Sequence, residues 1–166
     1  MKRRDKINYY LDIAETVLER STCLRRNFGA IIVKNDQIIS TGYNGAPRGR
    51  QNCSDTDICS RDRLNIPKGQ RYELCRAVHA EANAVLNYRG SLKDLEGSTV
   101  YVTLFPCHDC AKILAQVGVG EVVYLDNKYA DTDDGRISRR ILDSCGISYR
   151  QVIVDVHIGT GEQAQQ

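Results

Sequence analysis

Residues 99–125 read TVYVTLFPCHDCAKILAQVGVGEVVYL, and this stretch decides the fold class. It opens with β-branched and aromatic residues, which are typical of a buried strand. Pro106 starts a turn, and the short amphipathic segment 109–117 ends at Gly118, as a helix commonly does. Residues 121–125 then form a second apolar run. A strand, a helix and a strand in this order predict two parallel strands joined by a crossover helix.

The rest of the chain extends this alternation on both sides. Apolar residues at helical spacing predict a first helix from about residue 4 to residue 20. Two runs rich in Ile and Val flank the turn Asn35-Asp36 and predict a β-hairpin. The other expected elements are the hairpin strands at 28–33 and 37–43, helices at 78–88 and 136–144, and a last strand at 147–156. We therefore expect an α/β fold with a mixed five-stranded sheet that is parallel in its second half.

A long segment before residue 78 interrupts this order. From residue 44 to about residue 70 no period persists, and glycine, proline and asparagine recur. A loop of this length inside a compact domain is usually functional or held by a metal ion. The 166 residues suit one domain with one core. We expect the domain to span residues 1–158, with a long loop at about 44–77, and to be followed by a frayed tail at 159–166.

Composition argues against several classes of partner. The net charge is only +2, with 23 basic and 21 acidic side chains, so it gives no strong electrostatic case for nucleic acid or a membrane. No stretch approaches the roughly 18 to 20 consecutive apolar residues of a membrane helix, and no apolar run typical of a signal peptide follows the basic N-terminus. The seven cysteines favour metal binding in a reducing cytoplasm, that of the host if the chain is viral.

Two short motifs, each at the start of a predicted helix, carry the chemistry. They are HAE at residues 79–81 and PCHDC at residues 106–110. Cys107 and Cys110 are three residues apart, so both sulfurs can reach one ion from the first turn of a helix. The helix N-terminus also favours thiolate over thiol. With His79 as the third ligand, the set fits a catalytic zinc that keeps one position open to water.

Glu81 lies two residues beyond His79, where we expect it beside the metal without binding it. Zinc lowers the pKa of a bound water from about 15.7 towards 7, so hydroxide becomes available near neutral pH. Glu81 would take the proton and deliver it to a ring nitrogen and then to a leaving amine. His-x-Glu followed by Pro-Cys-x-x-Cys is the signature of the zinc-dependent deaminases.

Each motif alone has a simpler explanation. Cys-x-x-Cys also serves structural zinc and redox sites, and His-x-Glu by itself is a weak signal. A closed structural zinc in a binding module would not explain the carboxylate beside His79. Both motifs in this order, each opening a helix, favour a catalytic site. We expect His108 at the surface or behind the metal ligands.

Beyond the metal motifs, the chain resembles the deoxycytidylate deaminase family over residues 21–150. The matching segments are STC at 21–23, RR at 25–26, TGYNGAPRG at 41–49, VHAEANA at 78–84, TLFPCHDC at 103–110 and DNKYAD at 126–131. The resemblance implies a three-layer α/β/α sandwich that hydrolyses dCMP to dUMP and ammonia, which supplies dUMP for thymidylate synthesis. It also implies a homohexamer that dCTP activates and dTTP with Mg²⁺ inhibits.

The same resemblance implies roles for individual residues. By their places in the motifs, Asn44 resembles the residue that reads the sugar and Tyr129 one that packs at the nucleotide. Arg26 and Lys128 are candidate contacts to the 5′-phosphate, although both could equally be solvated surface residues. Gly45 and Arg48 resemble the turn that binds the triphosphate of the effector, where glycine lets backbone N–H groups approach phosphate. Asn44-Gly45 could instead only shape a turn.

The cysteines of the long loop resemble part of a second, structural zinc site. Cys53, Cys59 and Cys75 match three of four ligands, whereas Asn52 stands where family members often carry histidine. Such an ion would keep an irregular loop ordered, since structural zinc contributes about 10 kcal/mol or more. The candidates for the fourth ligand are Asp55, Asp57, Cys23 and a water molecule. Alternatively, the three cysteines are simply reduced and packed.

Three competing functions share the catalytic motif. A nucleic-acid-editing deaminase of the tRNA adenosine type would need a basic surface and an open pocket, which the near-neutral charge disfavours. A deaminase of free cytidine or deoxycytidine would not need the candidate phosphate contacts Arg26 and Lys128. A regulatory or DNA-uptake protein that has lost activity would not need all four catalytic-site residues.

Overall fold

One five-stranded sheet organises residues 1–153, the part of the chain that the computed structural model describes. Its strands are β1 (Gly29–Lys34), β2 (Gln37–Tyr43), β3 (Thr99–Leu104), β4 (Glu121–Asp126) and β5 (Ser148–Gln151). They lie in the order β2-β1-β3-β4-β5. β1 pairs antiparallel with β2 and β3, whereas β3, β4 and β5 are parallel. The predicted mixed sheet with a parallel second half is confirmed.

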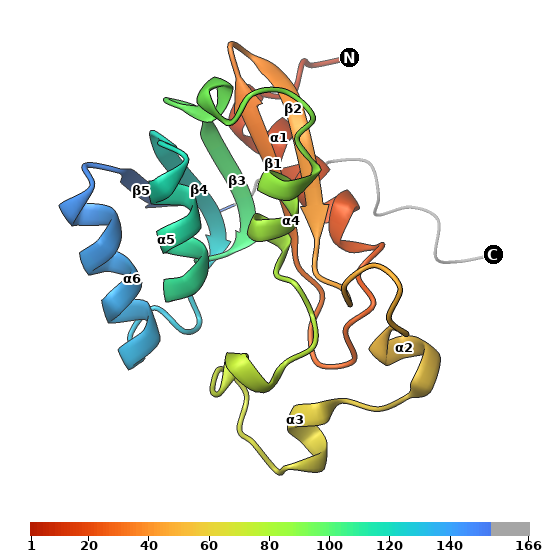
Figure 1. Cartoon of the computed structure of the whole chain (residues 1–166). Coiled ribbons are helices and arrows are strands. Elements are labelled where there is room, and N and C mark those ends of the chain that lie inside the picture. The colour runs from red at the N-terminus through yellow and green to blue at the C-terminus, as the bar shows by residue number, and fades with distance from the viewer. Residues whose placement is uncertain (154–166) are drawn as a thin grey trace.

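Helices cover both faces of the sheet and complete the three-layer α/β/α sandwich (Figure 1). They are α1 (Lys6–Leu18), α2 (Cys53–Thr56), α3 (Ser60–Arg63), α4 (Ala80–Asn87), α5 (His108–Gln116) and α6 (Asp133–Ser144), with 3₁₀ turns at Tyr72–Leu74 and Leu92–Leu95. Alternate residues of β1 enter opposite cores, because successive side chains of a strand point to opposite faces. Ile31 packs with α1 residues such as Leu11, and Ile32 packs with residues of α4, α5 and α6.

Two predicted boundaries are wrong by several residues. Helix α6 begins at Asp133 rather than Arg136, because the Thr132 side chain accepts a hydrogen bond from the Gly135 N–H at 3.2 Å and caps the helix. Strand β5 ends at Gln151, short of the expected residue 156. The predicted frayed tail at 159–166 lies outside the described residues. Within residues 1–153, no helix combines the length and apolarity needed to cross a membrane.

The segment between β2 and α4 forms a lobe beside the sandwich, on the side of the carboxyl ends of β3 and β4 (Figure 1). We call residues 46–77 the lobe. It was expected to lack regular structure, but it contains the one-turn helices α2 and α3. Its two ends meet where Gly45 and Val78 exchange backbone hydrogen bonds of 3.1 and 2.8 Å. Ligands of open α/β sheets bind at the carboxyl ends of strands, so the lobe adjoins the expected site.

Candidate metal centre and active site

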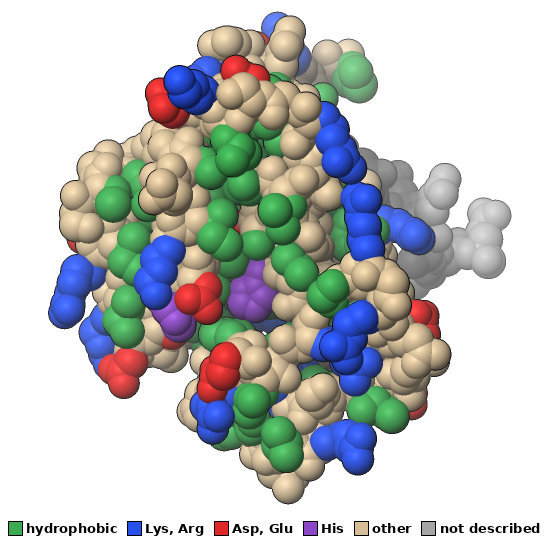
Figure 2. All heavy atoms as spheres, in the orientation of Figure 1, with side chains coloured by type: hydrophobic (Ala, Val, Ile, Leu, Met, Phe, Trp, Pro, Cys, Tyr) green, Lys and Arg blue, Asp and Glu red, His purple; other side chains and the backbone are tan. Residues whose placement is uncertain are grey.

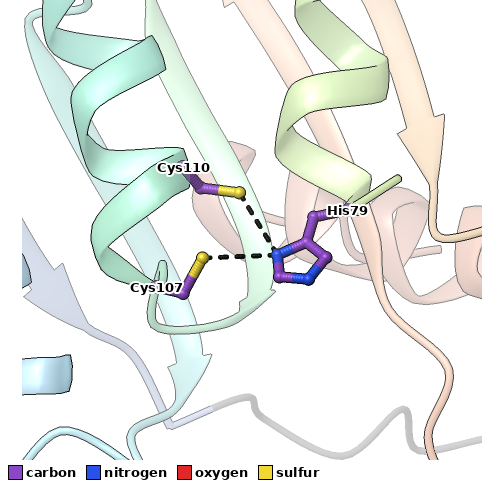
Figure 3. A group of neighbouring side chains, drawn as sticks. All are labelled: His79, Cys107 and Cys110. Carbon is purple, nitrogen blue, oxygen red and sulfur yellow. Dashed lines mark hydrogen bonds between the residues drawn. The ribbon is translucent and has the colours of Figure 1, made fainter. Parts of the chain in front are cut away.

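Two helix N-termini meet beside the sheet and bring the predicted metal ligands together. His79 is the N-cap residue of α4, Cys107 is the N-cap residue of α5, and Cys110 lies in the first turn of α5. Pro106 separates the end of β3 from α5. Figure 3 shows both cysteine sulfurs directed at the imidazole ring of His79 from the neighbouring helix.

The spacing of the three ligand atoms fits a zinc ion. The Nδ1 atom of His79 lies 3.3 Å from the Cys107 sulfur and 3.5 Å from the Cys110 sulfur. A tetrahedral zinc, with Zn–N of about 2.0 Å and Zn–S of about 2.3 Å, would place nitrogen and sulfur about 3.5 Å apart. Within residues 1–153 this is the only group of three or more His, Cys, Asp or Glu side chains whose ligand atoms all lie within 4.8 Å of one another.

The thiols of Cys107 and Cys110 have pKa values shifted in opposite directions. A hydrogen bond from Cys110 lowers the pKa of Cys107 to about 5, and the same bond together with burial raises the pKa of Cys110. Burial alone would lower the pKa of His79, but the neighbouring Cys107 thiolate raises it to about 9. A metal ion that takes both sulfurs as thiolates and the imidazole as a neutral ligand must therefore displace protons from this group.

Glu81 is buried beside the metal-binding group, as the sequence predicted. Its side chain lies in the first turn of α4, two residues after His79. Burial raises the pKa of this carboxyl to about 7, and the negative charge of Cys107 adds to the effect. A carboxyl group with a pKa near neutrality can both accept and return a proton at physiological pH.

A pocket opens above the metal-binding group and contains about 840 Å³ of empty space, part of it continuous with solvent. Histidine side chains are visible in the space-filling view where the lobe meets the main body (Figure 2). The cationic side chains that line the pocket are Arg25, Arg26, Arg61 and Lys68. Its lining carboxylates are Glu81 and Asp134. The excess of positive charge favours an anionic ligand.

Three of the four predicted substrate residues, Asn44, Arg26 and Tyr129, line this pocket. The Asn44 side-chain oxygen accepts hydrogen bonds from Ser21 Oγ at 2.6 Å and from the Phe28 N–H at 2.8 Å. Its Nδ2 donates to the Arg26 carbonyl at 2.9 Å, which leaves one amide hydrogen for a ligand. The Arg26 guanidinium forms an ion pair with Asp126. Asn44 therefore shapes the pocket wall as well as facing the pocket.

Tyr129 and Lys128, which are also predicted substrate residues, take different positions. Tyr129 lines the pocket and packs against the lobe, since a Cβ on Gly69 would stand 2.9 Å from its ring. Lys128 is exposed and does not line the pocket, and its Nζ lies 5.7 Å from the centre of the Tyr129 ring. Lys128 is thus at the rim of the site rather than in its wall.

The predicted effector residues Gly45 and Arg48 lie outside the pocket. The Gly45 N–H already donates to the Val78 carbonyl at 3.1 Å, so it is not free to approach a phosphate. Arg48 is exposed beside it. The structure gives no direct indication of a triphosphate site at this turn.

The lobe cysteines lie near one another without forming a closed metal site. Cys53 and Cys59 are buried, and all seven cysteines of the chain are free thiols. Burial raises the pKa of Cys53, and the nearby thiols of Cys23, Cys59 and Cys75 add to that shift. No three of these sulfurs lie within 4.8 Å of one another. Asp55 accepts hydrogen bonds from the backbone N–H and side chain of Asn52 at 3.1 and 3.0 Å, which engages one candidate fourth ligand.

Several pocket residues were not predicted from the sequence. His108 forms an ion pair with Asp134, which joins the start of α5 to the start of α6 and places Asp134 in the pocket wall. Arg61 and Tyr72 come from the lobe, where no periodic pattern guides prediction. The Tyr72 ring meets the His79 ring edge-on, with centroids 5.3 Å apart. Their positions depend on the path of the lobe over the metal-binding group.

Comparison with known proteins agrees with this geometry. Residues 4–126 match the model of the cytidine and deoxycytidylate deaminase zinc-binding region. A probable deoxycytidylate deaminase of Drosophila melanogaster is 39% identical over 162 residues, covering 92% of this chain and 76% of the relative. The deoxycytidylate deaminase of Mycobacterium phage D29 is 43% identical over 130 residues, covering 75% of this chain and 97% of the relative.

A solved structure shows the same fold with nucleotides bound. The dCMP deaminase of cyanophage S-TIM5, in complex with dCMP and dUMP, superposes with a TM-score of 0.68 at 29% sequence identity. The match covers 91% of this chain and 100% of the cyanophage chain. Together with the metal-binding group and the buried Glu81, these matches show that the chain belongs to the cytidine and deoxycytidylate deaminase family, a family of hydrolytic enzymes.

Proposed function

We propose that this chain hydrolyses dCMP to dUMP and ammonia with one catalytic zinc, and so supplies dUMP for thymidylate synthesis. The observation that carries the proposal is the buried carboxyl of Glu81 beside His79, Cys107 and Cys110, at the bottom of a pocket with excess positive charge. The pocket charge suits a nucleotide with a 5′-phosphate better than a free nucleoside. The names of the relatives point to the same substrate.

In this mechanism the zinc, held by His79, Cys107 and Cys110, would activate the water that attacks C4 of the pyrimidine. Glu81 accepts a proton from that water and delivers it to the ring nitrogen N3. Glu81 then passes the proton of the hydroxyl on C4 to the N4 amine, the C4–N4 bond breaks and ammonia leaves, and the C4 carbonyl of dUMP remains. Phe105 and Tyr129 contribute aromatic surface to the wall around these transfers.

Side chains of the pocket would orient the nucleotide. We assign Asn44 to the sugar through its remaining amide hydrogen, and Tyr129 to packing against the nucleotide. Arg26 and Lys128 are assigned to the 5′-phosphate, Arg26 from the pocket wall and Lys128 from the rim. Phosphate binding at Arg26 would compete with its ion pair to Asp126.

An ammonia-release assay on dCMP, dCTP, deoxycytidine and a single-stranded oligonucleotide tests the proposal. We expect turnover of dCMP with kcat/KM well above that of deoxycytidine, because a site built for phosphate loses affinity when phosphate is missing. Activity mainly on the oligonucleotide would support a nucleic-acid-editing enzyme instead. Equal rates on dCMP and deoxycytidine would support a nucleoside deaminase.

Regulation and assembly form a separate part of the proposal. On the resemblance of residues 41–49 to the family, we propose activation by dCTP and inhibition by dTTP with Mg²⁺, with Gly45 and Arg48 in the effector site of a homohexamer. Since the Gly45 N–H is engaged by Val78, effector binding at this residue would require the turn to change shape. Light scattering gives the assembly size, and dCMP turnover with each effector gives its sign.

A second, structural zinc in the lobe is also proposed. Its support is that the thiols of Cys23, Cys59 and Cys75 lie near enough to Cys53 to raise its pKa, in addition to the larger effect of burial. A zinc ion would have to draw these sulfurs closer than they lie here. Elemental analysis tests this directly, because two zinc ions per chain support the second site and one excludes it.

We further propose that the enzyme works in the cytoplasm, or in that of the host if the chain is viral. The support is that the cysteines are free thiols and that several are proposed metal ligands, which suits a reducing compartment. Cell fractionation with an antibody to the chain tests this proposal.

A further inference from the structure

Three of the four cationic side chains that line the pocket are arginines, and they differ in what they contact. Arg25 is used by the protein itself: its Nε donates to Asp62 at 2.7 Å, and its other nitrogens donate to the carbonyls of Ile66 and Pro67. Arg26 is neutralised by its ion pair with Asp126. These two arginines therefore have counter-charges or acceptors supplied by the chain.

Arg61 has no carboxylate partner and only one hydrogen-bond acceptor among the described residues. Only 7% of this residue is exposed, and within residues 1–153 no carboxylate lies within 4.0 Å of its guanidinium. One hydrogen bond, from Nη1 to the Gln70 carbonyl at 2.7 Å, fixes its orientation. Its Nε is buried without a hydrogen-bond partner in the described part of the chain. A buried charge with unused donors is unfavourable and normally has a partner, and because Arg61 lines the pocket, a ligand bound there can supply one.

The position of Arg61 fits one particular part of a nucleotide. Its guanidinium lies 5.0 Å from the centre of the Tyr72 ring, and that ring lies against the imidazole of His79. Arg61 is thus separated from the metal-binding group by one aromatic ring. In a nucleoside monophosphate the sugar separates the reacting base from the phosphate in a similar way, and Arg61 lines the same pocket as His79, so the phosphate of a nucleotide whose base lies at the metal could reach Arg61.

We propose that Arg61 binds the 5′-phosphate of the substrate and is the main determinant of the preference for a nucleotide over a nucleoside. A guanidinium presents paired N–H donors that match two phosphate oxygens, and charge-assisted bonds of this kind are strong in a buried site. Lys68, at the exposed part of the lobe, adds positive charge near the same end of the pocket. The proposal rests on the proposed function, because it requires a phosphorylated substrate.

The test compares Arg61→Gln with wild type on dCMP and on deoxycytidine, using the zinc-loaded enzyme. We expect kcat/KM for dCMP to fall roughly 100-fold, while kcat/KM for deoxycytidine changes little, because only the phosphate contact is lost. Arg61→Lys keeps the positive charge but loses the paired N–H donors of the guanidinium. We expect its kcat/KM for dCMP to lie between the values of wild type and Arg61→Gln. If deoxycytidine turnover is below detection, the inhibition constants of dUMP and deoxyuridine replace it in the same comparison.

Arg76→Gln is the matched control. The Nε of Arg76 is also buried without a partner, but Arg76 does not line the pocket, so its replacement should leave the ratio of the two kcat/KM values unchanged. An equal loss on both substrates in Arg61→Gln would overturn the proposal in favour of a purely structural role. An unchanged ratio in Arg61→Gln, with a reduced ratio in Arg26→Gln, would assign the phosphate to Arg26. A wild-type enzyme inactive on dCMP would instead refute the proposed function.

Discussion

Gly42 of β2 lies so close to Ala84 of α4 that a Cβ atom on Gly42 would stand 2.3 Å from the backbone nitrogen of Ala84. The same Cβ would stand 2.3 Å from the carbonyl oxygen of Ala80. Only glycine allows the strand and the helix to approach to this distance. Because α4 also carries His79 and Glu81, this contact sets the depth at which the catalytic groups lie against the sheet.

Replacing Gly42 with alanine should therefore damage both stability and the metal centre. The helix backbone must move to admit the methyl group, and such overpacking costs about 2–3 kcal/mol. We expect the urea midpoint to fall and zinc to bind more weakly. Thr41→Ala, at the adjacent exposed position of the same strand, is the control and should cost less than about 1 kcal/mol. Equal stability of Gly42→Ala and wild type would contradict the packing argument.

Replacing Glu81 with glutamine should abolish the proton transfers without removing the metal. Glutamine keeps the shape of the side chain but cannot accept or return a proton, so kcat on dCMP should fall roughly 1,000-fold or more. Zinc content measured by elemental analysis should stay at the wild-type value. Asp109→Asn is the control, since this exposed carboxylate lies in α5 near the metal ligands and should be replaceable with little loss. Normal turnover by Glu81→Gln would disprove the mechanism.

The pH dependence of kcat/KM should show an acid limb from Glu81. Burial raises the pKa of this carboxyl to about 7 from the ordinary 4.5, and the group accepts a proton only when ionised. Activity should thus be full above the raised pKa and decline about tenfold per pH unit below it. The positive charge of bound zinc lowers the midpoint, so we expect it between pH 4.5 and about 7. An acid limb with its midpoint below pH 4.5, the ordinary pKa of this carboxyl, would argue against this assignment.

Zinc affinity should increase with pH because binding displaces protons. The pKa of the Cys110 thiol is raised, so this thiol resists ionisation until a metal ion takes its place beside the Cys107 thiolate. Competition with a chelator at pH 6 and pH 8 should show tighter binding at the higher pH. Chelation should abolish activity, and added zinc should restore it. Cys145→Ser, which changes an exposed cysteine remote from the ligand group, serves as the control.

The fold could be predicted to a large extent because its signals are local. Alternating strands and helices gave the mixed sheet, and HAE and PCHDC gave the His79–Cys107–Cys110 group and Glu81. Boundaries failed where side-chain capping rather than apolar periodicity decides the first residue, as at Thr132 before α6. The Thr-Asp-Asp-Gly segment at 132–135 contained that signal.

The pocket wall could not be predicted to the same degree. Arg61 and Tyr72 reach the site only because the lobe folds back over His79, and that path depends on tertiary contacts such as those of Arg25 with Asp62 and Pro67. No periodic pattern within residues 46–77 encodes these contacts. The engagement of the Gly45 N–H by Val78 is likewise a long-range pairing that a turn motif does not reveal.

The bridge between Gly45 and Val78 ties the two ends of the lobe together at its base. Everything between them can be regarded as a cassette inserted into the sandwich, while the zinc ligands and the proton carrier reside in the recipient scaffold. One part of the pocket wall, including Arg61 and Tyr72, is consequently encoded in a different stretch of the gene from the catalytic groups, whereas Asn44, Arg26 and Tyr129 belong to the scaffold. Exchange of the segment across this bridge would therefore alter one side of the pocket while the catalytic groups and the remaining wall stay in place.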